Sequence, residues 1–215
     1  MSETTYPRIL TQDPSFKALA FCIYDGEDTI YIDNCHSELG QNIGFERVFT
    51  TCQSLWCEYR SKLDTYPTFD YIFSEIPPPV GNFAAGLYAL DTLIMSHLEC
   101  RVSNIENIFI FSPSYLSTIH NTRKYNKSDS TQLAKFFMNE VLQDHFKFVL
   151  PDTVTATGKT RKGVMNNDRA EAFLFMLRAF CRFNVKGLRN TIIEQMAGLG
   201  VEAEKPLHST STKEE

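Results

Sequence analysis

The sequence RILTQDPSFKALAFCIYD, residues 8–25, contains two apolar runs separated by a polar turn. Ile9 and Leu10 form the first run, and Ala18–Tyr24 forms the second, so both have the composition of neighbouring strands. Pro14 follows Asp13 and favours a turn at that point. Asp13 therefore lies where one strand ends and a tight turn begins. Taken alone, an aspartate in this position indicates only a turn.

The segments that follow predict an α/β domain. A third short strand at residues 29–32 extends the first two into an antiparallel meander. The remaining apolar patterns predict, in order, a helix at Phe45–Leu63, a strand at 69–76, a helix at 82–99, a strand at 107–111, a helix from Ser128 or Ser130 to 142, and a last helix that Asn166, Asn167 or Asp168 caps and that runs to Phe183. Strands that alternate with helices predict parallel pairing and right-handed crossovers. The segment at 152–167 is polar and rich in glycine and basic residues, which predicts a loop.

Length and composition favour one globular domain that is not secreted and whose cysteines are reduced thiols. The chain has 215 residues, of which 43% are hydrophobic, and this is enough for a sizeable core. We expect the domain to span residues 1–197 and the polar stretch 198–215 to be a disordered tail. No apolar leader or membrane-spanning run is seen, and the six cysteines show no paired spacing. These features predict a cytoplasmic or nuclear protein without membrane contact or a zinc site.

The net charge of −5 conceals a strong asymmetry along the chain. Residues 1–119 carry 6 basic and 15 acidic side chains, whereas residues 120–189 carry 13 basic and 6 acidic ones. Such a basic segment is what a phosphate-binding face requires, because each Lys or Arg near a phosphate releases counterions. A solvated surface without a partner would show the same run of charges.

Carboxylates occur at the ends of three predicted elements: Asp13 after the first strand, Glu75 at the end of the fourth, and Asp168 with Glu171 on the last helix. Residues at i and i+3 share a helix face, so the last two can point to one place. If these elements meet, like-charge repulsion calls for cations, and oxygen-only ligands favour Mg²⁺ or Mn²⁺. Two such ions can promote the hydrolysis of a phosphodiester.

These motifs resemble the RuvC-type Holliday junction resolvases, a branch of the RNase H-like nucleases, and especially their phage and large-virus forms. The matching residues are Ile9-Leu10-Thr11-Gln12-Asp13-Pro14-Ser15, then Tyr71-Ile72-Phe73-Ser74-Glu75 with Ile76-Pro77, and last Asp168-Arg169-Ala170-Glu171-Ala172. The resemblance implies a central mixed five-stranded sheet flanked by helices, with two Mg²⁺ ions held by the four carboxylates. It also implies a homodimer that cleaves four-way junctions or other branched DNA. Glu171 departs from the family, which commonly has aspartate there.

The resemblance further implies a basic residue beside the carboxylates, and the sequence itself offers other candidates for contact with DNA. A catalytic or phosphate-contacting lysine is expected just before the last helix, where Lys159, Arg161 and Lys162 lie, and Lys159 and Lys162 are both candidates. Phe83 could stack on an unpaired base or belong to the core. Arg123, Lys124 and Lys127 surround an aromatic residue and could follow a DNA backbone or form a solvated loop.

Two alternatives share this fold. Another RNase H-like nuclease, acting on RNA in hybrids or on viral concatemers, would keep the carboxylates and differ in substrate. A catalytically inactive protein that only binds DNA or a partner would show no metal-dependent cleavage with any substrate.

Overall fold

A six-stranded mixed sheet forms the centre of the protein. The computed structural model describes residues 6–15, 18–36, 45–75, 84–111, 127–154 and 160–199. In the order β5-β4-β1-β2-β3-β6, the strands are Ile108–Phe111, Tyr71–Glu75, Ile9–Pro14, Ala18–Tyr24, Thr29–His36 and Lys147–Val149. β1, β2 and β3 pair antiparallel, whereas β4 is parallel to β1, β5 to β4, and β6 to β3. The predicted α/β arrangement, with its antiparallel meander and parallel strands flanked by helices, is therefore confirmed, but the sheet has six strands and not the predicted five.

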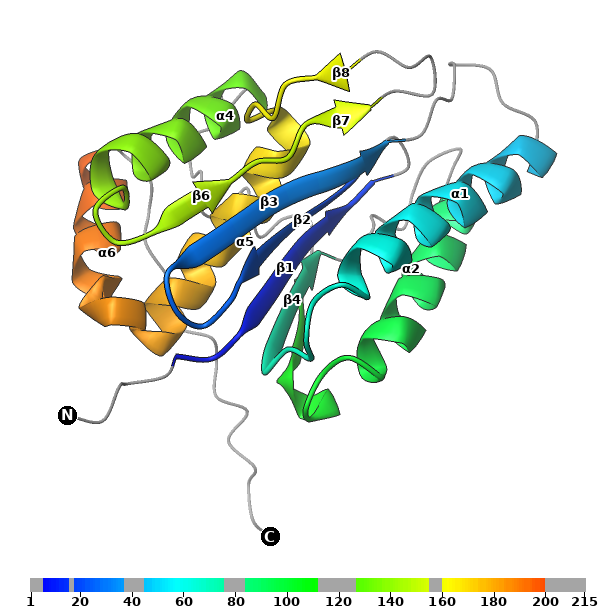
Figure 1. Ribbon diagram of the computed structural model, residues 1–215, viewed down its shortest axis with the longest axis horizontal. Helices are drawn as coiled ribbons and strands as arrows, with labels where there is room; N and C mark the ends of the chain where they lie inside the picture. Colours follow the sequence, from blue (N-terminus) through cyan, green and yellow to red (C-terminus); the bar gives the residue numbers. More distant parts are fainter. Residues whose placement is uncertain are drawn as a thin grey trace, which may run out of the picture.

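Helices cover both faces of this sheet (Figure 1). α1 (Phe45–Leu63) and α2 (Ala84–Glu99) lie on one face, and α4 (Lys127–Phe136), α5 (Asn167–Phe183) and α6 (Arg189–Gly198) lie on the other. Short helical turns at Ile105–Asn107, Phe137–Val141 and Val185–Gly187 join or extend these elements. None of the helices in the described ranges is long and apolar enough to cross a bilayer.

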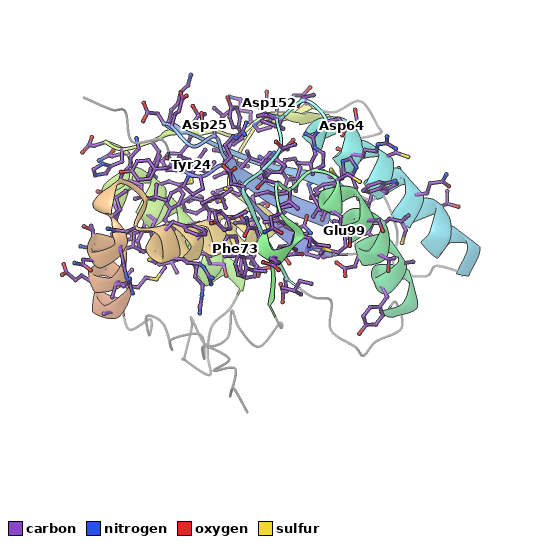
Figure 2. The ribbon with its side chains drawn as sticks, turned by 90° about the horizontal axis from the view of Figure 1, so that it is seen from below. Tyr24, Asp25, Asp64, Phe73, Glu99 and Asp152 are labelled. Atoms are coloured by element: carbon purple, nitrogen blue, oxygen red, sulfur yellow. The ribbon has the colours of Figure 1, made fainter. Side chains whose placement is uncertain are left out.

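Each face of the sheet has its own apolar core. The larger core packs β1, β2, β3 and α4 around α5, whose side chains from Ala172 to Leu177 are all buried. Figure 2 shows Phe73 from β4 among the side chains near α5. The smaller core joins α1 and α2 to the opposite face through Leu55, Tyr59 and Leu90. α5 is therefore the helix that fixes one face of β1 from end to end.

The register places the C-terminal ends of the parallel strands β1 and β4 side by side. Thr11 of β1 lies beside Phe73 of β4, and Gln12 lies beside Ser74. The next residues along these strands are Asp13 and Glu75. Both strands run in the same direction, so both carboxylates lie at the same end of the sheet.

The structure differs from the sequence-based expectation in several elements. β3 continues to His36, beyond the predicted end at 32, because residues 33–36 pair with β2 and because Asp33 and Asn34 are buried against Arg169. The predicted loop at 152–167 contains a small hairpin of β7 (Thr153–Val154) and β8 (Thr160–Arg161). β6 and α6 have no counterpart in the prediction. The predicted tail falls almost wholly outside the described residues, so the domain division stays a prediction.

Candidate active site

Asp13 is a buried carboxylate at the end of β1. Its side chain is 6% exposed, and its backbone pairs with Ala20 of β2. Thr11, two residues earlier and on the same face of the strand, donates its hydroxyl hydrogen bond to the carbonyl of Ala172 in α5 at 2.7 Å. Asp13 therefore faces the first turns of α5.

Three other carboxylates interact with Asp13, and they are the other three that the sequence singled out. The Asp13 carboxyl makes side-chain hydrogen bonds with Glu75 from β4 and Glu171 from α5, and the charge of Asp168 also acts on it. Asp13 thus contacts one carboxylate from β4 and one from α5, and Asp168 acts on it through its charge. Their role in chemistry stays a prediction.

This crowding raises the pKa of Asp13 to about 8. Burial is the largest cause, because removal from water disfavours the charged form. The negative charge of Glu75 is the second cause, and the hydrogen bond with Glu171 acts in the opposite direction. The folded chain thus holds an acidic cluster that is unfavourable in its fully ionised state.

The donor set suits a hard divalent cation. Four carboxylates without sulfur or imidazole are the ligands that Mg²⁺ or Mn²⁺ prefers. Within the described ranges, no three His, Cys, Asp or Glu side chains are already arranged around a point that could hold a metal ion. Carboxyl groups that share hydrogen bonds face one another directly, and binding a cation requires their oxygens to turn toward it. The residues therefore fit such an ion in chemistry, with a local rearrangement of side chains.

The first turn of α5 leaves the Asp168 carboxylate free of a capping role. The Asn166 side chain accepts a hydrogen bond from the Arg169 backbone N–H at 2.9 Å and is the N-cap. Of the three predicted capping residues, Asn166 is therefore the one observed. Asp168 lies in the first turn, where a negative charge is favourable near the helix N-terminus.

Sequence reasoning missed the uncharged side chains that tie the carboxylate-bearing elements together. Besides the hydrogen bond from Thr11 to α5, the Gln12 amide donates to the Ser74 hydroxyl at 2.8 Å, and the Tyr59 hydroxyl donates to Gln12. Gln12 and Ser74 directly precede Asp13 and Glu75, so their contact fixes the two strand ends side by side. Polar residues within an otherwise apolar strand were the signal that could have indicated them.

Arg169 is a second residue that sequence reasoning missed, and it changes the interpretation of the basic segment. Its side chain is 2% exposed and contacts Asp33 and Asn34 of β3. Lys186 is similarly engaged with Asp28, and Arg182 lies over the Phe109 ring. Segment 120–189 therefore does not present all 13 of its basic residues to a partner, because Arg169 is buried and supports the fold.

The predicted DNA-contacting residues are only partly described. Lys162 is exposed, and Val164, two residues later, accepts a hydrogen bond from Arg169, so the base of the β7–β8 hairpin lies beside the start of α5. The backbones of Arg161 and Lys127 lie in β8 and at the start of α4. Phe83, Arg123, Lys124 and Lys159 lie outside the described residues.

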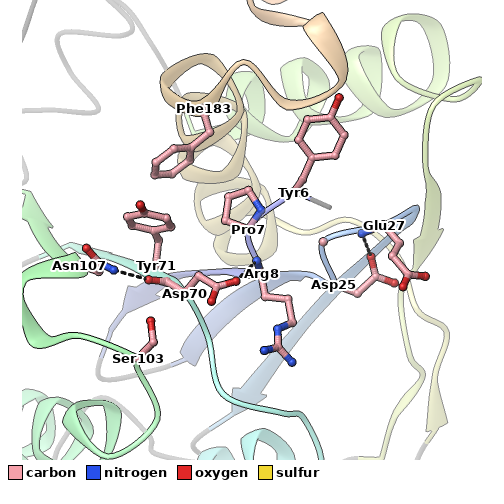
Figure 3. Close-up of a pocket in the computed structure, with 11 residues that line it drawn as sticks. Tyr6, Pro7, Arg8, Asp25, Glu27, Asp70, Tyr71, Ser103, Asn107 and Phe183 are labelled. Carbon is pink, nitrogen blue, oxygen red and sulfur yellow. Dashed lines mark hydrogen bonds between the residues drawn. The ribbon is translucent and has the colours of Figure 1, made fainter. Parts of the chain in front are cut away.

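A cavity of about 810 Å³ lies at the opposite end of the sheet (Figure 3). Its lining includes Arg8 and Asp70, which come just before β1 and β4. The Asp70 carboxylate accepts a hydrogen bond from the Arg8 backbone N–H at 2.8 Å, and Asp25 accepts one from the Glu27 N–H at 2.9 Å. These carboxylates stabilise turns, and none of the predicted site residues lines the cavity. The acidic cluster is the stronger candidate for an active site.

Replacing Asp13 by asparagine is expected to stabilise the metal-free protein at pH 8. The pKa of Asp13 is raised from 3.8 to about 8, so the folded state binds more protons than the unfolded state between these values. Its contribution to stability is thus fully present below about pH 4 and is lost as the pH rises toward 8. The Asp13→Asn variant lacks this loss, and we expect a gain on the order of 2 kcal/mol at pH 8 that shrinks at pH 5. Urea unfolding in EDTA measures this gain in the free energy of unfolding. A variant less stable than the wild type at pH 8 would contradict the conclusion that the ionised Asp13 carboxylate is unfavourable.

No protein-family model matches the sequence, and no curated protein matches it. Among solved structures, the yeast mitochondrial Holliday junction resolvase Ydc2 has 14% identity and a TM-score of 0.44, with 90% of this chain and 89% of that chain covered. RuvC of Thermus thermophilus has 12% identity and a TM-score of 0.45, with 83% and 97% covered. T. thermophilus RuvC in complex with a Holliday junction substrate has 9% identity and a TM-score of 0.37, with 60% and 78% covered. Matches at this level do not establish the family of the chain.

Proposed function

We propose that this chain is a divalent-metal-dependent endonuclease that cleaves four-way or otherwise branched DNA. The observation that carries the proposal is the buried carboxyl of Asp13, which contacts Glu75 and Glu171 and lies in the field of Asp168. An acidic cluster of this kind opposes folding unless a cation or protons neutralise it. The choice of DNA as substrate rests on the motifs shared with RuvC-type resolvases.

The four proposed ligands are positioned by three elements of the fold. Asp13 and Glu75 would hold the metal from the adjacent ends of β1 and β4, and Asp168 with Glu171 would hold it from α5. Bound Mg²⁺ or Mn²⁺ would activate water and stabilise the leaving oxygen in phosphodiester hydrolysis. The protein itself contributes orientation, because the contacts of Thr11 and Gln12 fix these elements against one another.

The DNA would approach the end of the sheet at which β1 and β4 have their C-terminal ends. Lys162 is exposed beside the start of α5, where a cation can contact a phosphate next to the cluster. We include Lys159, Arg161, Arg123, Lys124, Lys127 and Phe83 in the same proposed surface on the basis of the sequence alone. A two-fold symmetric junction suits a homodimer, and the exposed Tyr88 and Leu93 of α2 are candidate contacts for it.

Wild-type protein is expected to nick a labelled immobile four-way junction in Mg²⁺ and not in EDTA. The assay should include a flap, an RNA–DNA hybrid and a linear duplex at the same concentration, because RNase H-like nucleases share the carboxylates. Preferential cleavage of the hybrid would show that the substrate is an RNA–DNA hybrid and not a DNA junction.

A second candidate is a DNA-binding protein that does not cleave. It is favoured by the observation that the described side chains form no ready-made cation site. Junction binding without cleavage of any substrate in Mg²⁺ or Mn²⁺ would support this candidate and overturn the nuclease.

A further inference from the structure

The buried side chain of Arg169, in the first turn of α5, donates four hydrogen bonds. Its Nε donates to Asn34 Oδ1 at 3.0 Å, and its Nη2 donates to Asp33 Oδ1 at 2.9 Å. Nη2 also donates to the carbonyl of Pro151 at 2.9 Å, and Nη1 donates to that of Val164 at 3.2 Å. One planar guanidinium thus joins α5, β3 and both sides of the β7–β8 hairpin.

The partners of Arg169 are themselves held by a third element. Asp33 Oδ2 lies 2.8 Å from Lys62 Nζ of α1, and this ammonium also donates to the Asn34 carbonyl at 3.0 Å. The Asn34 amide nitrogen lies 2.7 Å from His36 Nε2. The end of β3 therefore has a fixed position, set from α1 on one face of the sheet and from α5 on the other.

This contact lies in line with the acidic cluster. Asn34 pairs with Ala20, and Ala20 pairs with Asp13, so the three residues form one row across β3, β2 and β1. β6 pairs only with residues 29–31 of β3, which leaves the edge beside Asp33 open to the guanidinium. Arg169 can therefore set the first turn of α5 against the row that contains Asp13.

We propose that Arg169 is a positioning residue that holds Asp168 and Glu171 at the correct place against Asp13 for metal binding. Asp168 precedes Arg169 directly, and Glu171 lies two residues later in the same first turns of α5. The inference rests on the proposed function of the cluster as a metal site. An error of about 1 Å in such a helix end is enough to weaken a site of several ligands. A lysine cannot replace the arginine, because one ammonium cannot reach oxygens on three segments.

Calorimetric titration of Mn²⁺ into the metal-free full-length chain tests the inference without any cleavage. Residues that orient metal ligands typically change metal affinity by 10–100-fold, so we expect Arg169→Lys to weaken Mn²⁺ binding by about tenfold or more. Asp13→Asn should abolish the same binding and thereby assign it to the cluster.

Arg101→Lys is the matched control. Arg101 also donates to backbone carbonyls, those of Leu63 and Tyr66, but beside the bridge between Phe69 and Val102, at the opposite end of β4 from Glu75. We expect this variant to bind Mn²⁺ like the wild type even where its melting temperature falls as much as that of Arg169→Lys. If Arg169→Lys does not fold, Asp33→Asn keeps the arginine and removes its charged partner, and the same weakening is expected from it.

The outcomes separate the inference from the proposed function. Wild-type affinity in Arg169→Lys, or in Asp33→Asn where the former does not fold, would overturn the positioning role and leave the function intact. Mn²⁺ binding by the wild type without cleavage of any DNA would overturn the function, and the affinities of the variants would still decide the role of Arg169. No binding by the wild type would overturn both.

Discussion

Asp13→Asn is expected to reduce junction cleavage by at least about 10³-fold, which corresponds to about 4 kcal/mol in the activation free energy. Asp13 is the carboxylate that contacts both Glu75 and Glu171, so its loss removes the centre of the proposed metal site. The neutral amide is close in shape and should leave the sheet intact. Single-turnover rates at saturating protein and Mg²⁺ measure the loss.

DNA binding by this variant should be unchanged within about twofold, because phosphate contacts supply most of the affinity. Asp91→Asn is the control, since Asp91 is a half-buried carboxylate whose pKa is also raised by burial but which lies on α2, on the opposite face of the sheet. It should cleave like the wild type. Equal loss of binding and cleavage in Asp13→Asn would contradict the metal role and indicate a misfolded surface.

Arg169→Met is expected to destabilise the protein by about 3–5 kcal/mol. Removal of the guanidinium leaves Asp33 with only Lys62 as a charged partner, and it leaves Asn34 Oδ1 and the carbonyls of Pro151 and Val164 without their donor. At about 2–4 °C per kcal/mol for a chain of this size, the melting temperature should fall by about 10 °C. Urea unfolding at pH 7 gives the free energy directly.

The contrast is Arg60→Met. Arg60 pairs with Asp64 at 3.4 Å on the surface of α1, where its side chain is 59% exposed. Such a pair contributes at most about 1 kcal/mol. If the two variants lose the same stability, the buried network of Arg169 does not have the importance that its contacts indicate.

Elements with a strong local pattern could be predicted from the sequence. The apolar repeat of α1 predicted Phe45–Leu63, and these are the observed bounds. β1 and β2 were found in the same way, because short apolar runs separated by a turn have few other solutions. β6 was not predicted, since its three residues become a strand only by pairing with β3, more than a hundred residues earlier.

The candidate site shows the same division between local and distant information. The four carboxylates could be named because each lies at a recognisable point in a motif. The role of Asp33 and Asn34 could not be predicted, because polar residues after an apolar run have the composition of a loop. Only the structure shows that Arg169 contacts them. The hairpin of β7 and β8 was missed for a related reason: its composition is that of a loop, and its two short strands are stabilised by each other.

The hydrogen bond from Thr11 to Ala172 joins residues 161 positions apart, so it cannot form during synthesis until α5 has left the ribosome. A ribosome-bound chain that still lacks α5 has no partner for that face of β1 and no acidic cluster. The proposed cleavage activity therefore requires synthesis through α5, and we expect a fragment truncated before α5 to lack it. Because such distant contacts form late, folding should also be slow for a chain of this length.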